Sequence, residues 1–282
     1  MTDPLVDAAG SRHEPAGPGA RIVCLVPSIT ELLCDLGLAG QLVGRTGFCI
    51  HPRAVVRAIP KVGGTKDVKL TAVRALAPTH VVVNVEENTR ETADALRAFV
   101  PQLIVTHPQA PLDNLALYRL LGGIFGREEE ADALCTALTT EAVALAAAVA
   151  ARPPRNVLYL IWRDPWMAVA PDTYIGRTLA LAGLHTLPGS AECAELASAR
   201  GASPDAARYP EVDVTAFAGR VDEVLLSSEP YRFRAKHLAE VEALVPGALV
   251  RLVDGEMTSW YGSRAVAGLR YLREFAATEP SG

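Results

Sequence analysis

All three tryptophans of this chain fall in loop-like sequence, each after a segment typical of a buried strand. Trp162 and Trp166 lie in the stretch IWRDPWM, and Trp260 directly precedes Tyr261. Aromatic rings at the carboxyl ends of strands are well placed to stack on a flat ligand and exclude water from it. The alternative is that these rings pack a loop or an interface, and the sequence leaves both interpretations open.

Polar side chains suited to holding a ligand accompany the rings. Arg264 could hold a carboxylate or an amide through its planar guanidinium, and Arg163 could do the same or simply pair with Asp164. Tyr174 opens a predicted helix and could belong only to its cap. The other candidates for the rim of a binding site lie in two acidic loops: Glu86, Glu87, Glu229 and Tyr231. Loop carboxylates of this kind are also often merely solvated.

Cys49 and His51 are of residue types that bind metals. A thiolate or an imidazole could occupy an axial position of iron or cobalt. Alternation places both side chains on one side of an extended segment. The competing interpretation is that Cys49 is a small buried apolar residue and that the dipeptide His51-Pro52 is structural.

The elements that must position these residues follow an α/β pattern, because short apolar runs alternate with amphipathic stretches. Predicted strands cover 21–26, 81–84, 103–106, 157–161, 224–227 and 249–253. Predicted helices cover about 29–37, 71–76, 91–99 and 112–125. Ser28 is expected to cap the first of these helices, with Glu31 in the capping-box position and Gly37 at the end.

The segment 127–151 is an uninterrupted run of helix formers that Pro153 and Pro154 end. It predicts one rigid helix, residues 127–152, that joins an N-terminal lobe (21–126) to a C-terminal lobe (153–277). The lobes echo each other: LTAV at 70–73 and VTAF at 214–217 each lead into a strand followed by an acidic loop. This repeat favours two duplicated lobes with a ligand cleft between them.

Composition restricts the function. Half of the 282 residues are apolar and the net charge is −5, with scattered basic residues, which argues against a nucleic-acid partner. Five cysteines without CxxC spacing argue against a disulfide framework or a zinc site. Residues 1–20 lack a basic start and an apolar run, so they predict a disordered leader and a cytoplasmic protein, or a periplasmic one if a signal peptide has been removed. Apolar stretches of membrane-spanning length contain charges or helix breakers, so no membrane insertion is expected.

The chain resembles the helical-backbone metal receptors, the class III substrate-binding proteins of bacterial ABC importers. The resemblance is carried by RIVCLVPSITELLCDLGL (21–38), HPRAVVRAIPKVGGTKDVKL (51–70), RALAPTHVVV (74–83) and WYGSRAVAGLRYL (260–272). It implies two Rossmann-like lobes bridged by one long helix and a monomer without enzyme activity. It also implies a metal-complex ligand that is not covalently bound: cobalamin or another corrinoid first, then a ferric siderophore or haem.

The resemblance also implies a surface glutamate on each lobe for docking to the permease. Threonine occupies both matched positions, Thr71 and Thr215, which removes the ion pairs on which such docking relies. We therefore expect a cytosolic relative that kept the ligand site and lost the transporter. The main competing hypothesis is a cytosolic enzyme or delivery factor acting on a metallocofactor, although the sequence contains no P-loop, GxSxG or HExxH motif. A third is a sensor that signals through lobe closure.

Overall fold

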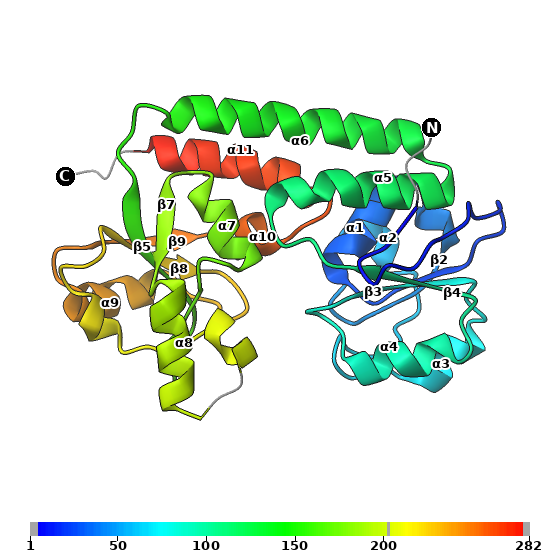
Figure 1. Cartoon of the computed structure of the whole chain (residues 1–282), viewed down its shortest axis with the longest axis horizontal. Helices are drawn as coiled ribbons and strands as arrows, with labels where there is room; N and C mark the ends of the chain where they lie inside the picture. The colour runs from blue at the N-terminus through cyan, green and yellow to red at the C-terminus, as the bar shows by residue number, and fades with distance from the viewer. Residues whose placement is uncertain (1–4, 202–203, 279–282) are drawn as a thin grey trace. The chain divides into compact units, whose positions relative to one another are not determined.

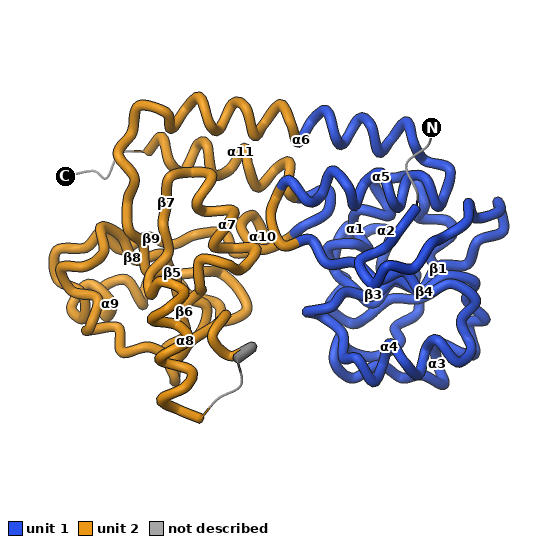
Figure 2. Tube along the Cα trace, in the orientation of Figure 1, with its two compact units in different colours: residues 1–108, 112–138, 261–264 blue, residues 109–111, 139–260, 265–282 orange. Residues whose placement is uncertain are grey.

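The computed structural model describes residues 5–201 and 204–278. The chain forms two compact units (Figure 2). Unit 1 comprises residues 1–108, 112–138 and 261–264, and unit 2 comprises 109–111, 139–260 and 265–282. Each unit is an α/β structure with a mainly parallel sheet, which confirms the predicted fold class. The exact lobe boundaries expected from the sequence stay a prediction.

Unit 1 is built on a four-stranded parallel sheet in the order β2-β1-β3-β4 (Figure 1). Its strands are β1 (Ile22–Cys24), β2 (Leu42–Arg45), β3 (His80–Asn84) and β4 (Gln102–Thr106). Its helices are α1 (Pro27–Asp35), α2 (Arg53–Val56), α3 (Leu70–Ala75), α4 (Arg90–Arg97) and α5 (Asn114–Phe125). Every residue of β3 is buried, as a central parallel strand covered on both faces should be.

Unit 2 contains a five-stranded sheet in the order β6-β5-β8-β9, with β7 also paired to β5. Its strands are β5 (Arg155–Trp162), β6 (Met167–Ala168), β7 (Leu184–Leu187), β8 (Glu223–Ser227) and β9 (Leu249–Val253). Its helices are α7 (Tyr174–Ala180), α8 (Ser190–Ala199), α9 (Leu238–Leu244), α10 (Gly255–Ser259) and most of α11 (Arg264–Ala277). Only β6 runs antiparallel to its partner, so the other four strands end at a common edge.

The predicted long helix is α6 (Glu128–Val149), 22 residues in length. Its length and hydropathy alone would allow α6 to cross a membrane, but a core helix of a globular protein passes the same test. Its buried residues Ala131, Cys135, Leu138 and Leu145 recur at helical spacing and form one packing stripe. On the unit 2 half, Glu141 accepts hydrogen bonds from two arginines of α11, Arg270 at 2.8 Å and Arg273 at 3.3 Å. This helix therefore packs on protein along one side.

Three strands were not predicted from the sequence: β2, β6 and β7. Each has two to four residues, and β2 includes Gly44 and Arg45, so none presents a clear apolar run. The predicted capping box of α1 is also wrong. Val26 occupies the N-cap position without a side-chain bond, and Glu31 instead pairs with Arg264 at 2.7 Å. The predicted end of this helix is confirmed, since Gly37 adopts a left-handed conformation directly after it.

The N-terminal segment differs from the disordered leader that we expected. Residues 1–4 lie outside the described part, but Asp7 and His13 are buried and form an ion pair at 3.1 Å. Asp7 also accepts the backbone N–H of Val105, and the Ala8 N–H donates to the Val105 carbonyl. Val105 belongs to β4, the edge strand, so this segment satisfies edge groups that would otherwise be open to another chain. Polar composition suggested disorder, whereas one well-placed carboxylate fixes the segment.

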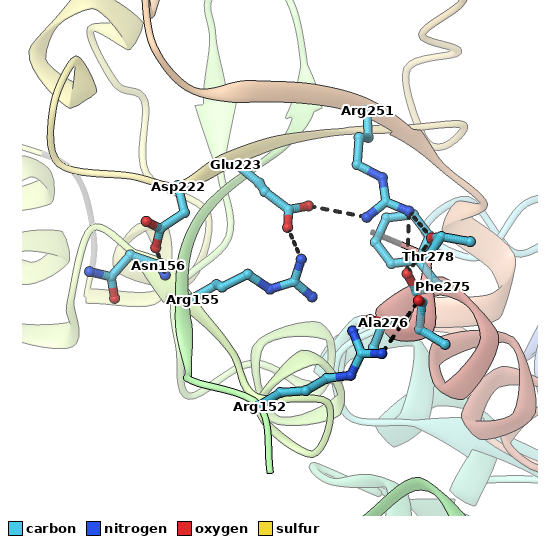
Figure 3. A network of polar contacts seen from close by, with 10 residues as sticks. Arg152, Arg155, Asn156, Asp222, Glu223, Arg251, Phe275, Ala276 and Thr278 are labelled. Carbon is cyan, nitrogen blue, oxygen red and sulfur yellow. Dashed lines mark hydrogen bonds and ion pairs between the residues drawn. The ribbon is translucent and has the colours of Figure 1, made fainter. Parts of the chain in front are cut away.

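A buried carboxylate joins three elements at the amino end of the unit 2 sheet (Figure 3). Glu223 of β8 lies between Arg155 of β5 and Arg251 of β9 and forms an ion pair with each. Arg251 also lies 3.7 Å from the centre of the Phe275 ring and donates to Thr278, near the end of α11. Arg152 donates to the carbonyl of Ala276 in the same region. The network ties neighbouring strands to the C-terminal helix.

Candidate ligand-binding site

The carboxyl edge of the unit 1 sheet carries exposed apolar side chains. Phe48 is 62% exposed and Ile50 is 48% exposed, both shortly after β2, and Val85 is 52% exposed directly after β3. The loop that carries Phe48 is supported by a tight hairpin at residues 63–68, because the Gly47 N–H donates to the Gly63 carbonyl. Ligands of open α/β sheets bind outside the carboxyl ends of the strands, so these exposed apolar side chains are candidates for ligand contact.

Glu86 and Glu87 lie in a loop of the same edge that side chains hold in place. Asn84, the last residue of β3, accepts the backbone N–H groups of both glutamates through its Oδ1. The Glu86 carboxylate lies 3.3 Å from the imidazole of His107, the first residue after β4. Both glutamates are half-buried, so this loop presents polar groups in a fixed arrangement at the position where the sequence predicted a rim.

Unit 2 places an aromatic cluster at its carboxyl edge. The Trp162 ring meets Tyr231 edge-on at 5.8 Å, and Tyr231 meets Phe233 at 4.8 Å. Trp166 stacks on Phe233 with the ring planes 5° apart. Phe233 belongs to the hydrophobic core of unit 2, and Trp166 packs against that core. Trp162 keeps 39% of its surface exposed. Trp162 is therefore the ring of this cluster best placed to meet a ligand, whereas Trp166 mainly stabilises the unit.

Arg163 is engaged by carboxylates on both sides. Its guanidinium donates to Glu240 of α9 at 2.6 Å and to Asp164 at 3.2 Å, and it lies 5.7 Å from the centre of the Trp166 ring. The hydrogen bond with Glu240 raises the pKa of Arg163. The structure therefore supports the interpretation in which Arg163 pairs with Asp164. It also adds a second partner, Glu240, which is distant in the sequence and was not predicted.

Trp260 and Glu229 form one hydrogen-bonded group. The indole N–H of Trp260 donates to Glu229 Oε1 at 2.9 Å, and the Ser259 hydroxyl donates to the same oxygen at 2.6 Å. Burial raises the pKa of Glu229, against the opposing effect of these hydrogen bonds. The predicted rim residue Glu229 and the predicted stacking residue Trp260 thus lie together after strands β8 and β9, and the carboxylate orients the indole ring.

Replacing Glu229 by glutamine should stabilise unit 2 at neutral pH. A carboxyl group whose pKa is higher in the folded state stabilises fully below its unfolded pKa, and this contribution is lost as pH rises through the folded pKa. The neutral amide keeps an oxygen that accepts both hydrogen bonds and avoids burying a charge. The gain in unfolding free energy should therefore be present at pH 8 and disappear below about pH 4.

Urea unfolding followed by tryptophan fluorescence measures this effect, because all three tryptophans lie in unit 2. Glu242→Gln on the exposed face of α9 is the matched control. An equal gain in both variants, or a gain independent of pH, would contradict the burial argument.

Three predicted binding residues are buried or paired within the protein. Tyr174 is the first residue of α7 and is buried. Tyr261 is buried with its hydroxyl beside Ser28, and burial raises its pKa well above the usual value. Arg264 forms a two-point ion pair with Glu31, at 2.8 and 2.7 Å. The roles of these three side chains in contacting a ligand stay predictions.

Cys49 and His51, the two proposed metal ligands, differ in their exposure to solvent. Cys49 is fully buried, accepts a hydrogen bond from the Thr30 hydroxyl at 3.0 Å and lies 3.2 Å from that of Thr46. Desolvation raises the pKa of its thiol, which disfavours the thiolate that metals bind. Burial and the raised thiol pKa do not favour Cys49 as a metal ligand, and this role stays a prediction. His51 is half-buried, and its role as a metal ligand stays a prediction.

Sequence reasoning missed Phe48, Ile50 and Val85. Each is a single apolar residue beside glycine, cysteine or acidic residues, so neither periodicity nor a motif marks it. The usable signal was position, because all three fall just beyond a strand end. Their exposure depends on tertiary packing and could not be read from the residue type.

Exposed apolar and aromatic side chains at the carboxyl edges of two α/β units define a protein that binds small molecules. Residues 22–199, more than half of the chain, match the model of the family described as periplasmic binding protein, so the chain belongs to that family. A search of curated proteins found no match.

Solved structures share the fold. The periplasmic vitamin B12-binding protein BtuF of Vibrio cholerae is 14% identical, with a TM-score of 0.76 over 93% of this chain and 99% of that chain. The periplasmic haem-binding protein RhuT of Roseiflexus is 20% identical, with a TM-score of 0.71 over 92% and 99%. A periplasmic haem-binding protein of Pseudomonas aeruginosa is 20% identical, with a TM-score of 0.71 over 93% and 95%. These neighbours are named as periplasmic binding proteins, so the comparisons give no support to the cytoplasmic location that we expected.

Proposed function

We propose that this protein binds a metal-containing macrocycle or chelate without transforming it, with a corrinoid such as cobalamin first and a ferric siderophore or haem next. The observation that carries the proposal is the exposure of Phe48, Ile50 and Val85 in unit 1 and of Trp162 in unit 2. The first three lie in loops that follow strands, and Trp162 is the last residue of β5, so all four lie at edges where α/β sheets bind ligands. Such side chains suit the broad apolar faces of a flat macrocycle better than a small polar solute.

The chemistry of the candidate residues supports the order of these ligands. A corrinoid brings its own axial ligands, so it needs apolar contact and hydrogen bonds more than a protein donor to the metal. Haem iron in proteins usually takes an axial histidine, cysteine, methionine or tyrosine. Of the two predicted metal donors, Cys49 is buried, which leaves His51. The named ligands of the structural neighbours, vitamin B12 and haem, belong to the same proposed class.

The test is a titration of the purified protein with cobalamin, cobinamide, haem and ferric siderophores, followed by absorbance and thermal shift. A ligand at a hundred times its dissociation constant should stabilise the fold by about 2.7 kcal/mol. Phe48→Ala and Trp162→Ala should each weaken binding by roughly 10-fold or more, since an aromatic ring buries a large apolar area on contact.

Val143→Ala is the matched control, because Val143 is 65% exposed and belongs to α6, not to a loop that follows a strand. Trp166→Ala is a poor test because loss of the stacking on Phe233 would also lower stability. Equal binding by Phe48→Ala, Trp162→Ala and Val143→Ala would overturn the proposed site. Chemical change of the bound ligand would favour an enzyme or a delivery factor instead.

The proposal does not include the ion pairs by which a permease would dock. Thr71 and Thr215 are both exposed and both occupy the second position of a short helical segment before a strand, α3 and the 3-10 turn Val214–Phe217. The Thr215 hydroxyl donates to Asp213 at 2.7 Å. The two positions are therefore equivalent within this chain, and their match to the family's docking glutamates stays a prediction. If that match holds, coupling to an importer would need other contacts.

A further inference from the structure

A groove of about 960 Å³ lies in unit 2 at the carboxyl ends of β8 and β9. Apolar side chains, including Leu226, Phe233, Leu252 and Val253, form part of its lining. Leu252 is 40% exposed although it belongs to a strand. The groove therefore combines the exposed side chain of Leu252 with the strand-end position at which α/β proteins bind ligands.

Two arginines line this groove and are held in place by the residue between them. Phe233 is 3% exposed, stacks on Trp166, and its N–H donates to the Ser227 carbonyl at 3.2 Å. Arg232 and Arg234, on either side of Phe233 in the sequence, are both exposed and both line the groove. The backbone N–H of Arg234 donates to the imidazole of His237 at 2.9 Å, which fixes the chain on that side as well. The short segment thus presents two guanidinium groups from a backbone that buried contacts make rigid.

Two of the three acids that line the groove accept hydrogen bonds from neighbouring groups. Glu229 accepts hydrogen bonds from Ser259 and Trp260, and Asp254 accepts the N–H of Glu256 at the start of α10. Glu256 is the remaining acid of the lining. Within residues 5–201 and 204–278, neither Arg232 nor Arg234 takes part in an ion pair. A guanidinium offers several donors in a planar fork that matches carboxylate and phosphate oxygens.

We propose that Arg232 and Arg234 bind an anionic oxygen group, a carboxylate or a phosphodiester, at the periphery of the ligand. This inference rests on the proposed function and narrows it to complexes that carry such a group. The macrocycle itself would meet the exposed aromatic and apolar side chains, and the two arginines would select among ligands by their acidic substituents.

The experiment compares ligands that carry an anionic group with relatives that lack it. Haem is compared with its dimethyl ester, which lacks the free carboxylates. Cobalamin is compared with cobinamide, which lacks the whole nucleotide loop, including the phosphodiester, the ribose and the base. For whichever acidic ligand binds, Arg232→Gln/Arg234→Gln should weaken binding about 10- to 100-fold, the range expected for hydrogen bonds to a charged group. The same double variant should leave the affinity for the partner without the anion unchanged. A loss confined to the haem pair would identify a carboxylate, and a loss confined to the cobalamin pair a phosphodiester.

The control is Lys61→Gln/Arg119→Gln, which removes the same two charges from exposed positions of unit 1. Wild-type affinity for the acidic ligand should also fall with added salt, and that slope should flatten in the arginine variant only. Equal loss for acidic and esterified ligands, or no loss for either, would overturn the role of the arginines while leaving the proposed function standing. Failure of every ligand to bind the wild-type protein would instead overturn the proposed function.

Discussion

Replacing Glu223 by alanine should lower the free energy of unfolding of unit 2 by about 3–5 kcal/mol. The carboxylate is 3% exposed and is the ion-pair partner of both Arg155 and Arg251 (Figure 3). Its removal would leave two cations next to each other with little hydration, because their side chains are only 22% and 18% exposed. The remaining access of water to the arginines places the expected loss toward the lower end of that range.

Urea denaturation followed by tryptophan fluorescence reports on unit 2 and measures the loss directly. Glu240→Ala is the matched control, because it removes the carboxylate that pairs with Arg163 at the surface. Exposed pairs of this kind contribute only about 0–1 kcal/mol. If Glu223→Ala were no more destabilising than Glu240→Ala, the network at the amino end of the sheet would not hold β5, β8, β9 and α11 together as we infer.

Replacing Gly63 by alanine should disrupt the loop that carries Phe48, with a stability loss of about 3 kcal/mol or more. Gly63 has a φ of +111°, a backbone conformation that residues with a Cβ atom rarely adopt. An added Cβ would overlap the Asp67 carbonyl oxygen and lie 3.0 Å from the Lys69 nitrogen. These are backbone atoms of the same hairpin, which the Gly64 N–H closes by donating to the Asp67 carbonyl. The clash therefore cannot be relieved by turning a flexible side chain.

Because Gly47 donates to the Gly63 carbonyl, movement of this hairpin should also displace Phe48 and weaken ligand binding. Hydrogen exchange of β1 and β2 measures the local effect, and tryptophan fluorescence should show that unit 2 unfolds as in the wild type. Gly40→Ala is the control, since no atom lies within 4 Å of the added Cβ at a φ that side chains tolerate. Normal protection of β2 in the Gly63 variant would show that the hairpin adapts and that this glycine is not required.

Local sequence signals predicted the framework of this protein well. Six predicted strands match β1, β3, β4, β5, β8 and β9 closely, because parallel core strands are short apolar runs with recognisable turns on either side. The long helix was predicted to within a few residues, since helix formers run without a break until Pro153. The same local patterns carried the family resemblance, which the family model confirms.

The candidate site was only partly predictable, and the misses share a physical cause. Cys49 and Arg264 are of residue types that often bind ligands. In the structure, however, Cys49 is buried and hydrogen-bonded to Thr30, and Arg264 forms an ion pair with Glu31. Asp7 lies in a segment of polar composition, yet it closes the edge of β4 nearly a hundred residues away.

The sequence by itself thus determined the element order, the parallel sheets, the long helix and the class of protein, because these depend on residues close together in the chain. Only the tertiary structure decided which side chains face solvent. Exposure of Phe48 and Trp162, burial of Tyr261 and engagement of Glu229 by Trp260 depend on contacts between distant segments. Residue type sets what a side chain can do, and long-range packing decides whether a ligand can reach it.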